Sequence, residues 1–518
     1  MSPALFRRLL FPTLAILIAG LLWGFGKAPA KVSPTAAPES PDAKGVPAKT
    51  QVASKPVQPS EPAAEDRAGE DWPQFLGPLQ TGISGETGLL ESWPKEGPPK
   101  LWKRQIGTGY SAPSVAGNHL VIHHRVGNEE IIECLRADTG EPLWKQAYGS
   151  RFRDPYGYNN GPRCSPLLLK NRCYTLGAEG ALVCVALDTG DIVWKRDLQK
   201  EFTIPDGFFG MGCSPIAHEN SLIVLVGGQP KSGVAAFDLD TGKTVWEAVG
   251  KQTWDGVPTN GGDPDPYEWT GDEMMISYSS PLLATIHGQP HLLCLMRQGL
   301  VSLDPKTGRE RFKYWFRPRV HESVNAARPV VVDDKIFLSA AYKLGSALLK
   351  VKPDGDSYDV VWKNPRNMLT HWSTSIALDG HLYGFSGRHE EEGELRCLDV
   401  ETGRVDWQSN GWDRPLNDLA QNPTTGVITD AKTKVEIPYP FYGRGSKILA
   451  EGKFIVLAER GGMLALVRPS AEKVDEISRC TIPEMHYPSW TAPVLSRGRL
   501  YLRCEDALVC LDLKKPKD

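Results

Sequence analysis

One short pattern recurs along this chain and constrains its fold more than any other feature. It is clearest in residues 181–198, where an apolar run leads into Asp188-Thr189-Gly190 and Trp194 follows four residues after the glycine. The triplet predicts a tight turn, because Asp and Thr side chains bond nearby backbone and glycine tolerates positive φ. The flanking residues are β-branched, aromatic or apolar, which favours strands. We therefore predict a hairpin that ends on a tryptophan.

The same unit returns at intervals that are mostly about 40 to 55 residues, a period typical of strand-built propellers or arrays. An aromatic residue follows the turn glycine by four positions at Trp144, Trp194, Trp246, Phe312 and Trp407, and a degenerate copy ends at Trp362. Each repeat opens with a short polar or small stretch before an apolar strand. Eight such starts are present, at Ser111, Ser165, Ser214, Ser280, Arg328, Ser375, Lys447 and Ala492.

The two ends of the array complement each other. The last repeat ends near Leu513 without an outer tryptophan strand, and residues 101–104 supply a spare one that contains Trp102. If this strand completes the last blade, no sheet edge stays open. We therefore predict an all-β, eight-bladed β-propeller over residues 71–518, closed by its N- and C-terminal strands. Seven aromatic residues are predicted to be structural docking residues in the core: Trp102, Trp144, Trp194, Trp246, Phe312, Trp362 and Trp407.

The N-terminus lies outside this array. Arg7 and Arg8 precede an apolar run of residues 9–23, which is the layout of a secretory signal and is short for a membrane span. We predict that residues 1–27 are a signal peptide or an N-terminal membrane anchor. The protein is then exported, and either periplasmic or attached to the inner membrane by its N-terminus. Residues 28–70, rich in proline and alanine, are predicted to be a disordered linker.

Composition narrows the chemistry further. The formal net charge is −3, from 59 basic and 62 acidic residues without a basic stripe, so nucleic acid is not an expected partner. Ten cysteines permit disulfides in an exported chain but are too few to build a scaffold of this size. Cys164 and Cys213 each precede Ser-Pro at the starts of adjacent blades and are a candidate disulfide. Neither a His-Glu-x-x-His motif nor EF-hand spacing occurs, so no metal site is predicted.

The Asp-x-x-Thr-Gly-x-x-x-Trp repeats resemble the tryptophan-docking motifs of the pyrroloquinoline quinone (PQQ)-like β-propeller repeat family, in the quinoprotein alcohol dehydrogenase-like superfamily. The lead-in of residues 71–78, DWPQFLGP, resembles the opening of members of planctomycete type. The family includes PQQ-dependent dehydrogenases and non-catalytic, BamB-like members. The resemblance implies tryptophans packed between blades, and it makes PQQ and calcium conceivable cofactors. The vicinal cysteine pair of the dehydrogenases is absent from this sequence.

The connections between blades predict where binding occurs. In a four-stranded meander the Thr-Gly turns lie on one face, and the links to the next blade lie on the other, which we call the loop face. These links are long and irregular, and two of them, 250–278 and 410–446, are large enough to roof part of the central channel. Residues next to the blade starts are expected to point at the axis. They include Tyr110, Met211 and Tyr278, and the ligand-binding candidates Arg163, Asn325, Arg328, His371, Trp372, Arg444 and Trp490.

Arginines and aromatic rings in such a ring suit an anionic or sugar-like ligand, through bidentate hydrogen bonds and stacking. The alternative is that they line a wet channel and bond backbone carbonyls of neighbouring blades. These features favour a monomeric, non-catalytic binding or assembly scaffold that holds a protein or cell-envelope partner on its loop face. Two alternatives stay open. One is a PQQ-dependent oxidoreductase with a non-standard cofactor pocket, and the other is a polysaccharide-binding or -processing propeller.

Overall fold

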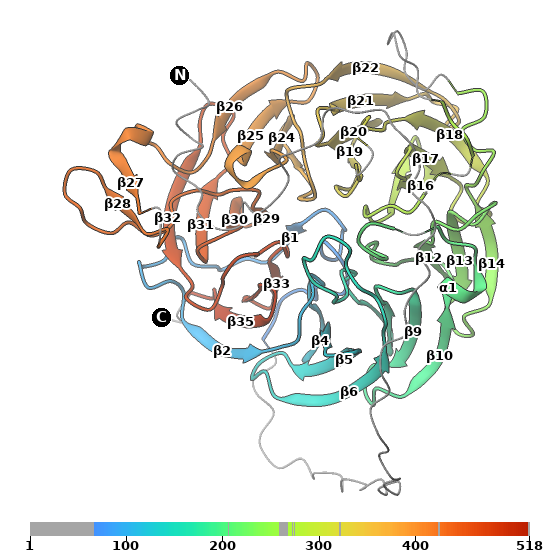
Figure 1. The fold of residues 1–518 in the computed structure, drawn as a ribbon, viewed down its shortest axis with the longest axis horizontal. Helices are drawn as coiled ribbons and strands as arrows, with labels where there is room; N and C mark the ends of the chain where they lie inside the picture. The colour runs from blue at the N-terminus through green and yellow to red at the C-terminus, as the bar shows by residue number, and fades with distance from the viewer. Residues whose placement is uncertain are drawn as a thin grey trace, which may run out of the picture.

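The predicted ring of blades is present in the computed structural model, which describes residues 67–205, 207–257, 268–271, 273, 275–320, 323–422 and 425–515. The described residues form an eight-bladed β-propeller, which confirms the predicted fold class (Figure 1). The predicted signal or anchor and nearly all of the predicted linker lie outside the described residues. The last linker residues are described, and Arg67 forms a bidentate ion pair with Asp512 at 2.8 Å.

The blades follow one another in chain order and are numbered accordingly. Blades 1 to 4 comprise β3 (Ser114–Ala116), β4 (His119–Val126), β5 (Glu129–Arg136) and β6 (Pro142–Gly149); β7 (Leu167–Leu169), β8 (Arg172–Leu176), β9 (Ala181–Ala186) and β10 (Ile192–Asp197); β11 (Ile216–His218), β12 (Ser221–Leu225), β13 (Val234–Asp238) and β14 (Thr244–Ala248); and β15 (Leu282–Ile286), β16 (Gln289–Leu295), β17 (Gly299–Leu303) and β18 (Glu310–Trp315).

Blades 5 to 8 comprise β19 (Val330–Val332), β20 (Lys335–Ala340), β21 (Gly345–Val351) and β22 (Tyr358–Asn364); β23 (Ile376–Leu378), β24 (His381–Ser386), β25 (Glu394–Asp399) and β26 (Val405–Ser409); β29 (Ser446–Ala450), β30 (Lys453–Leu457), β31 (Met463–Arg468) and β32 (Asp475–Thr481); and β33 (Val494–Ser496), β34 (Arg499–Arg503), β35 (Ala507–Asp512) and β2 (Lys100–Gln105). The remaining elements are β1 (Ile83–Ser84), α1 (Leu198–Glu201), η2 (Glu390–Glu392), η3 (Leu416–Asp418) and the hairpin β27 (Leu419–Gln421) and β28 (Ile428–Asp430).

The burial of each strand follows its place in the blade. Middle strands such as β12 and β13 are almost wholly buried, because neighbouring blades cover both of their faces, and they therefore read as continuous apolar runs. Outer strands such as β6 alternate between exposed and half-buried residues. In every blade the register between the third and outer strands shifts by one residue. In blades 1 to 6 and 8 the shift lies just before the docking residue, and in blade 7 Ser478 takes that position. Such a bulge redirects the following side chain.

The docking tryptophans lie between blades. The Trp194 indole of blade 2 packs on Gly242 of blade 3, where an added Cβ would come within 2.7 Å of the ring, so only glycine fits. The indole Nε1 donates to the Leu239 carbonyl at 2.9 Å. The same ring-on-glycine contact joins Trp102 to Gly140, Trp144 to Gly190, Trp246 to Gly308 and Trp362 to Gly403. The Thr-Gly turn of one blade therefore forms the seat for the indole of the preceding blade.

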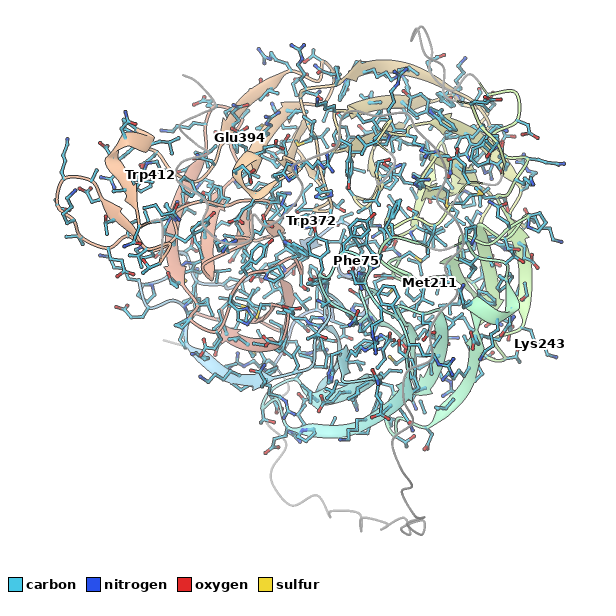
Figure 2. The ribbon with its side chains drawn as sticks, in the orientation of Figure 1. Phe75, Met211, Lys243, Trp372, Glu394 and Trp412 are labelled. Carbon is cyan, nitrogen blue, oxygen red and sulfur yellow. The ribbon has the colours of Figure 1, made fainter. Side chains whose placement is uncertain are left out.

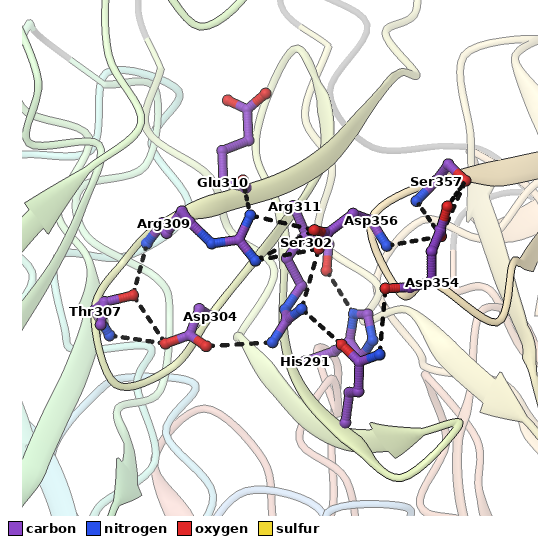
Figure 3. Close-up of polar contacts among 11 residues, drawn as sticks. His291, Ser302, Asp304, Thr307, Arg309, Glu310, Arg311, Asp354, Asp356 and Ser357 are labelled. Carbon is purple, nitrogen blue, oxygen red and sulfur yellow. Dashed lines mark hydrogen bonds and ion pairs between the residues drawn. The ribbon is translucent and has the colours of Figure 1, made fainter.

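The junction between blades 4 and 5 differs, because Phe312 replaces tryptophan and cannot donate a hydrogen bond. Polar groups connect the two blades there instead (Figure 3). Arg309 and Arg311 of blade 4 both pair with Asp356 of blade 5, at 3.2 and 3.1 Å, and Gln289 Nε2 donates to the Asp354 carbonyl at 3.2 Å. Ion pairs at the rim thus accompany the replacement of tryptophan by phenylalanine at this junction.

The ring closes as predicted. Strand β2 pairs antiparallel with β35, and Trp102 lies opposite Cys510. Its indole then docks on blade 1, where Nε1 donates to the Ala137 carbonyl at 3.1 Å. Pairing of the two ends of the described chain therefore completes blade 8.

The lead-in segment closes one end of the central channel. Trp72 forms an antiparallel bridge with Val115 of blade 1, and the Pro73 carbonyl accepts from the Leu168 amide of blade 2 at 2.8 Å. The segment then crosses the channel to blade 7, where β1 pairs in parallel with β29. Because these contacts lie along the innermost strands, the segment plugs the channel, and Phe75 lies near the centre of the ring (Figure 2).

The two large insertions lie mainly at the rim of the ring rather than over its channel. The hairpin β27–β28 of the 410–446 insertion lies at the outer rim beside β32 rather than over the axis (Figure 1). In the 250–278 insertion, Trp254 and Trp269 pack on Trp315 at the end of β18, an outer strand. The apolar side chains of these parts cover outer strands, and the described parts of the two insertions reach the axial cavity through their ends, at Tyr278 and Arg444. Among the described residues no helix is long and apolar enough to cross a bilayer.

The candidate disulfide is also not formed, since all ten cysteines are buried free thiols. Cys164 Sγ points to the Met211 carbonyl at 3.5 Å, and Cys213 Sγ points to the Leu225 carbonyl at 3.5 Å. Each thiol is thus directed to a backbone acceptor rather than to the other sulfur.

Candidate functional site

A cavity of about 340 Å³ lies on the axis of the propeller at the loop face. Phe75 of the lead-in segment forms part of its lining, so the plug supplies the floor. The walls come from the links and turns of the blades, and they include Tyr110, Tyr156, Tyr158, Arg163, Phe209, Tyr278, Tyr342, His371, Trp372, Arg388, His389, Arg444 and Trp490. Two wider grooves of about 580 and 750 Å³ lie toward the periphery, and charged side chains form much of their lining.

Aromatic rings form a nearly continuous wall around this cavity. Trp490 is central to it, with ring centroids 5.1 Å from Trp372, 4.9 Å from Tyr110 and 5.5 Å from Tyr158. The wall continues from Tyr158 to Phe209 at 6.0 Å. These separations are those of favourable tilted and edge-to-face pairs. The rings support one another, so the cavity is preorganised.

Arg444 holds the Trp372–Trp490 part of this wall. Its guanidinium forms a bidentate ion pair with the buried carboxylate of Glu459 and lies 4.4 Å from the centroid of the Trp372 ring. Glu459 also accepts from the Trp490 indole at 2.7 Å. A buried charge is tolerated when it is paired and hydrogen-bonded, as here. Arg444 is therefore committed to positioning the wall.

His371 is neutral in this environment. Burial, together with the nearby Arg444 and Arg388 guanidiniums, lowers its pKa to about 3. Arg444 Nη1 lies 3.2 Å from His371 Nδ1, and since arginine only donates, Nδ1 accepts. The ring proton is then on Nε2, which lies 3.0 Å from the Tyr342 hydroxyl. His371 therefore links Arg444 to Tyr342 and carries no charge.

Arg163 is committed in the same way on the other side of the cavity. Its Nη2 pairs with Asp154 at 2.6 Å, and Nη1 donates to the Gly161 carbonyl at 2.8 Å. The guanidinium lies 5.7 Å from the centroid of the Tyr110 ring. It therefore fixes the 149–163 link, which carries Tyr156 and Tyr158 to the cavity.

Arg388 is the cation that remains available. It lies in the turn between β24 and β25, and its guanidinium is 4.6 Å from the centroid of the Tyr342 ring. Its backbone makes hydrogen bonds, but no carboxylate among the described residues pairs with its side chain. A half-buried guanidinium beside an aromatic wall favours an anionic group on a ligand.

The structure brings most of the predicted ligand-binding residues together. Arg163, His371, Trp372, Arg444 and Trp490 line the cavity, as do Tyr110 and Tyr278. Asn325, Arg328 and Met211 do not.

Asn325 and Arg328 bond to the protein itself. Asn325 Nδ2 donates to the Met296 carbonyl at 2.9 Å, and it reaches two other backbone carbonyls as well. Arg328 is fully buried and donates to the side chain and carbonyl of Gln80 in the plug, at 2.8 and 3.1 Å, and to the Pro281 carbonyl. For Asn325 and Arg328 the sequence left open that they hydrogen-bond to backbone carbonyls of the protein itself instead of to a ligand. The structure shows this second arrangement.

The donor set does not suit a calcium-assisted quinone. Calcium takes six to eight oxygen ligands, largely carboxylates and carbonyls. None of the described residues that line the cavity is Asp or Glu, and three arginines line it instead. A dication beside these guanidiniums would meet like charge. The cavity therefore suits an anionic or aromatic ligand rather than a metal-bound cofactor.

Several lining residues were not identified from the sequence. Tyr156, Tyr158 and Phe209 lie in two of the long links, and their aromatic density was the available signal. Tyr342 and Arg388 lie in turns between the second and third strands, which also emerge on the loop face. Phe75 comes from the lead-in, and no local pattern indicated that this segment enters the channel.

Comparisons with known proteins agree with this architecture. The model of the family described as "Outer membrane protein assembly factor BamB" matches residues 128–409. Among curated proteins, no sequence matches this chain.

Solved structures show the same fold at low sequence identity. BamB from Moraxella catarrhalis has 13% identity and a TM-score of 0.50, and the match covers 81% of this chain and 98% of that one. Quinohemoprotein alcohol dehydrogenase from Comamonas testosteroni has 12% identity and a TM-score of 0.55, with coverage of 88% and 82%.

Proposed function

Since this chain belongs to the family of the outer membrane protein assembly factor BamB, whose propeller fold it has, we propose that it is a non-catalytic binding scaffold of the cell envelope. A protein partner binds to its loop face, and the aromatic cavity is the principal contact. The composition of the cavity carries this proposal. Tryptophan, tyrosine and arginine are the residues that dominate protein-binding hot spots.

The scaffold role rests on how the polar groups are used. Arg163 and Arg444 are occupied by Asp154 and Glu459, the buried His371 is neutral, and the described residues that line the cavity include no carboxylate to form an acid–base pair. What they offer is stacking surface and the Arg388 guanidinium. Such a site binds well and has little to offer general acid–base chemistry.

The partner's chemistry follows from the same groups. We infer a segment that presents an aromatic or large apolar side chain to the Trp372–Trp490 wall and a carboxylate to Arg388. This proposal requires that the protein is exported to the cell envelope, where such a partner is located. Arg7, Arg8 and the apolar run after them support export.

Site-specific photo-crosslinking in cells tests this proposal. A photoreactive phenylalanine analogue is placed at Tyr158, which is 52% exposed at the cavity, and in a second strain at Val245, which is 52% exposed on the outer strand β14. We expect a discrete adduct with an envelope protein at position 158 and none at 245. Arg388→Ala should reduce the adduct several-fold, whereas the exposed rim change Lys243→Ala should not.

Equal adducts at both positions, or no adduct at 158, would contradict the scaffold. The oxidoreductase alternative predicts a different result, namely that PQQ, calcium and an alcohol together produce reduction of an artificial electron acceptor. We expect no such turnover from the purified protein. A polysaccharide-binding protein would instead show a cavity-dependent shift in melting temperature with soluble glycans.

A further inference from the structure

A second cluster of reactive side chains lies outside the cavity, where the β32–β33 link meets the β34–β35 turn (Figure 1). His486 comes from the link, and Cys504 and Asp506 come from the turn. One ligand atom from each lies within 4.8 Å of the others. His486 Nε2 is 2.7 Å from Asp506 Oδ1, and Cys504 Sγ is 3.9 Å from the same oxygen.

These separations suit a tetrahedral divalent ion. Ligand bonds of about 2.0 Å for nitrogen and oxygen and about 2.3 Å for sulfur place neighbouring ligand atoms about 3.3 to 3.5 Å apart. The histidine–carboxylate pair needs to open by about half an ångström, and the thiol needs to approach by a similar amount. Since His486 is exposed and Asp506 is half-buried, water has access as a further ligand.

The second ring nitrogen of His486 is already in the position that a metal-bound histidine needs. His486 Nδ1 lies 3.2 Å from the Tyr487 carbonyl. A carbonyl can only accept, so Nδ1 donates its proton there, and Nε2 faces Cys504 and Asp506. At 2.7 Å from the Asp506 carboxylate, Nε2 also carries a proton until an ion takes its place. Metal-binding histidines almost always donate their other N–H to such a group, which fixes the tautomer and the ring orientation.

A similar group in blade 6, formed by His381, Cys397 and Asp406, has a structural explanation. Cys397 lies opposite the docking residue Trp407. The same cysteine–tryptophan pairing recurs at Cys134 and Trp144, Cys184 and Trp194, and Cys510 and Trp102.

Cys504 has no place in this repeat. Its thiol is directed into the cluster, at 3.6 Å from the Glu484 carbonyl of the same link that carries His486. Cys504 is buried at the edge of the blade 8 core, and its sulfur faces the other two residues of the cluster.

We propose that His486 Nε2, Cys504 Sγ and the Asp506 carboxylate bind one divalent transition-metal ion of the zinc class, with water as the fourth ligand. Imidazole, thiolate and carboxylate are the donors that zinc prefers. Binding displaces the protons of the Cys504 thiol and of His486 Nε2 to solvent. The ion joins the link to blade 8, and since this link also carries Tyr487 and Trp490, it fixes one wall of the aromatic cavity.

Cobalt(II) serves as the spectroscopic probe, added to the full chain with its thiols reduced and then displaced by zinc. We expect one equivalent to bind with a thiolate-to-cobalt charge-transfer band and tetrahedral d–d bands. Cys504→Ser should abolish the charge-transfer band. His486→Asn changes a side chain that is 51% exposed, so it should leave the fold intact while weakening binding at least tenfold.

Cys397→Ser is the matched control, because it removes a buried thiol from the blade 6 group and should leave the charge-transfer band and the stoichiometry unchanged. Zinc should raise the melting temperature of the wild type and of Cys397→Ser, but not that of His486→Asn. A charge-transfer band that survives in Cys504→Ser or disappears in Cys397→Ser would overturn the assignment. Absence of stoichiometric cobalt binding to the folded wild type would overturn it as well.

Discussion

Lys447 provides the sharpest test of the electrostatics near the axis. It lies in β29, the first strand of blade 7, and its exposed fraction is 2%. Its ammonium reaches the Thr374 carbonyl at 3.4 Å and lies 5.5 Å from the centroid of the Phe385 ring. No carboxylate among the described residues pairs with it. Burial lowers the pKa of this amine from 10.5 to about 7.

The shift gives the sign and the size of the expected effect. The unfolded chain keeps the proton up to about pH 10.5, whereas the folded chain loses it near pH 7, so folding is opposed by the charged amine at low pH. Each pKa unit corresponds to about 1.4 kcal/mol. The charged amine therefore destabilises the fold by roughly 3–5 kcal/mol below pH 7, and this penalty fades as the pH rises to about 10.5.

Lys447→Met keeps an unbranched apolar stem and removes the amine. We expect it to raise the denaturant midpoint at neutral pH, with a gain that shrinks toward about pH 10.5. Guanidinium unfolding followed by tryptophan fluorescence, in steps across this range, measures the effect. Lys243→Met, an exposed change on the outer rim, is the control and should follow the wild type (Figure 2). If Lys447→Met and the wild type respond to pH in parallel, the amine is not desolvated and the reasoning fails.

Further predictions concern the blades and the cavity. Trp194→Ala should cost about 3–5 kcal/mol, because it removes a packed indole, and a loss below about 1 kcal/mol in denaturant unfolding would contradict the docking role. Deletion of residues 98–106 removes β2 and should lower the melting temperature by many degrees, and an unchanged calorimetric scan would place the seam elsewhere. His371 resists protonation down to about pH 3, so the stability it contributes is present above about pH 6.5 and is lost as the pH falls from there. Acid unfolding of the wild type should therefore be steeper over this range than that of His371→Gln.

The repeated architecture could be predicted from the sequence because each unit records its own burial and turn. Asp188-Thr189-Gly190 followed by Trp194 specifies a local hairpin, and the partner of each blade is the next one along the chain. The spare strand with Trp102 was enough to place the seam, which β2 and β35 form. Both inferences need only local pattern and the requirement that no sheet edge remains open.

The use of each axial side chain was decided by the tertiary structure. Arg328 and Arg444 occupy similar places beside their blade starts, yet Arg328 bonds to the plug and Arg444 supports the cavity wall. Which partner each one meets depends on the lead-in segment and on Glu459, which no local pattern relates to them. The same holds for Phe75 in the floor.

The proposed metal-binding group of His486, Cys504 and Asp506 is likewise decided by the tertiary structure. His486 and Cys504 are brought together by a link and a turn that belong to different parts of blades 7 and 8. Periodicity reports which residues are buried and where the chain turns, since these are properties of short segments. Convergence of side chains from several blades depends on irregular links, whose paths are set by packing across the whole ring.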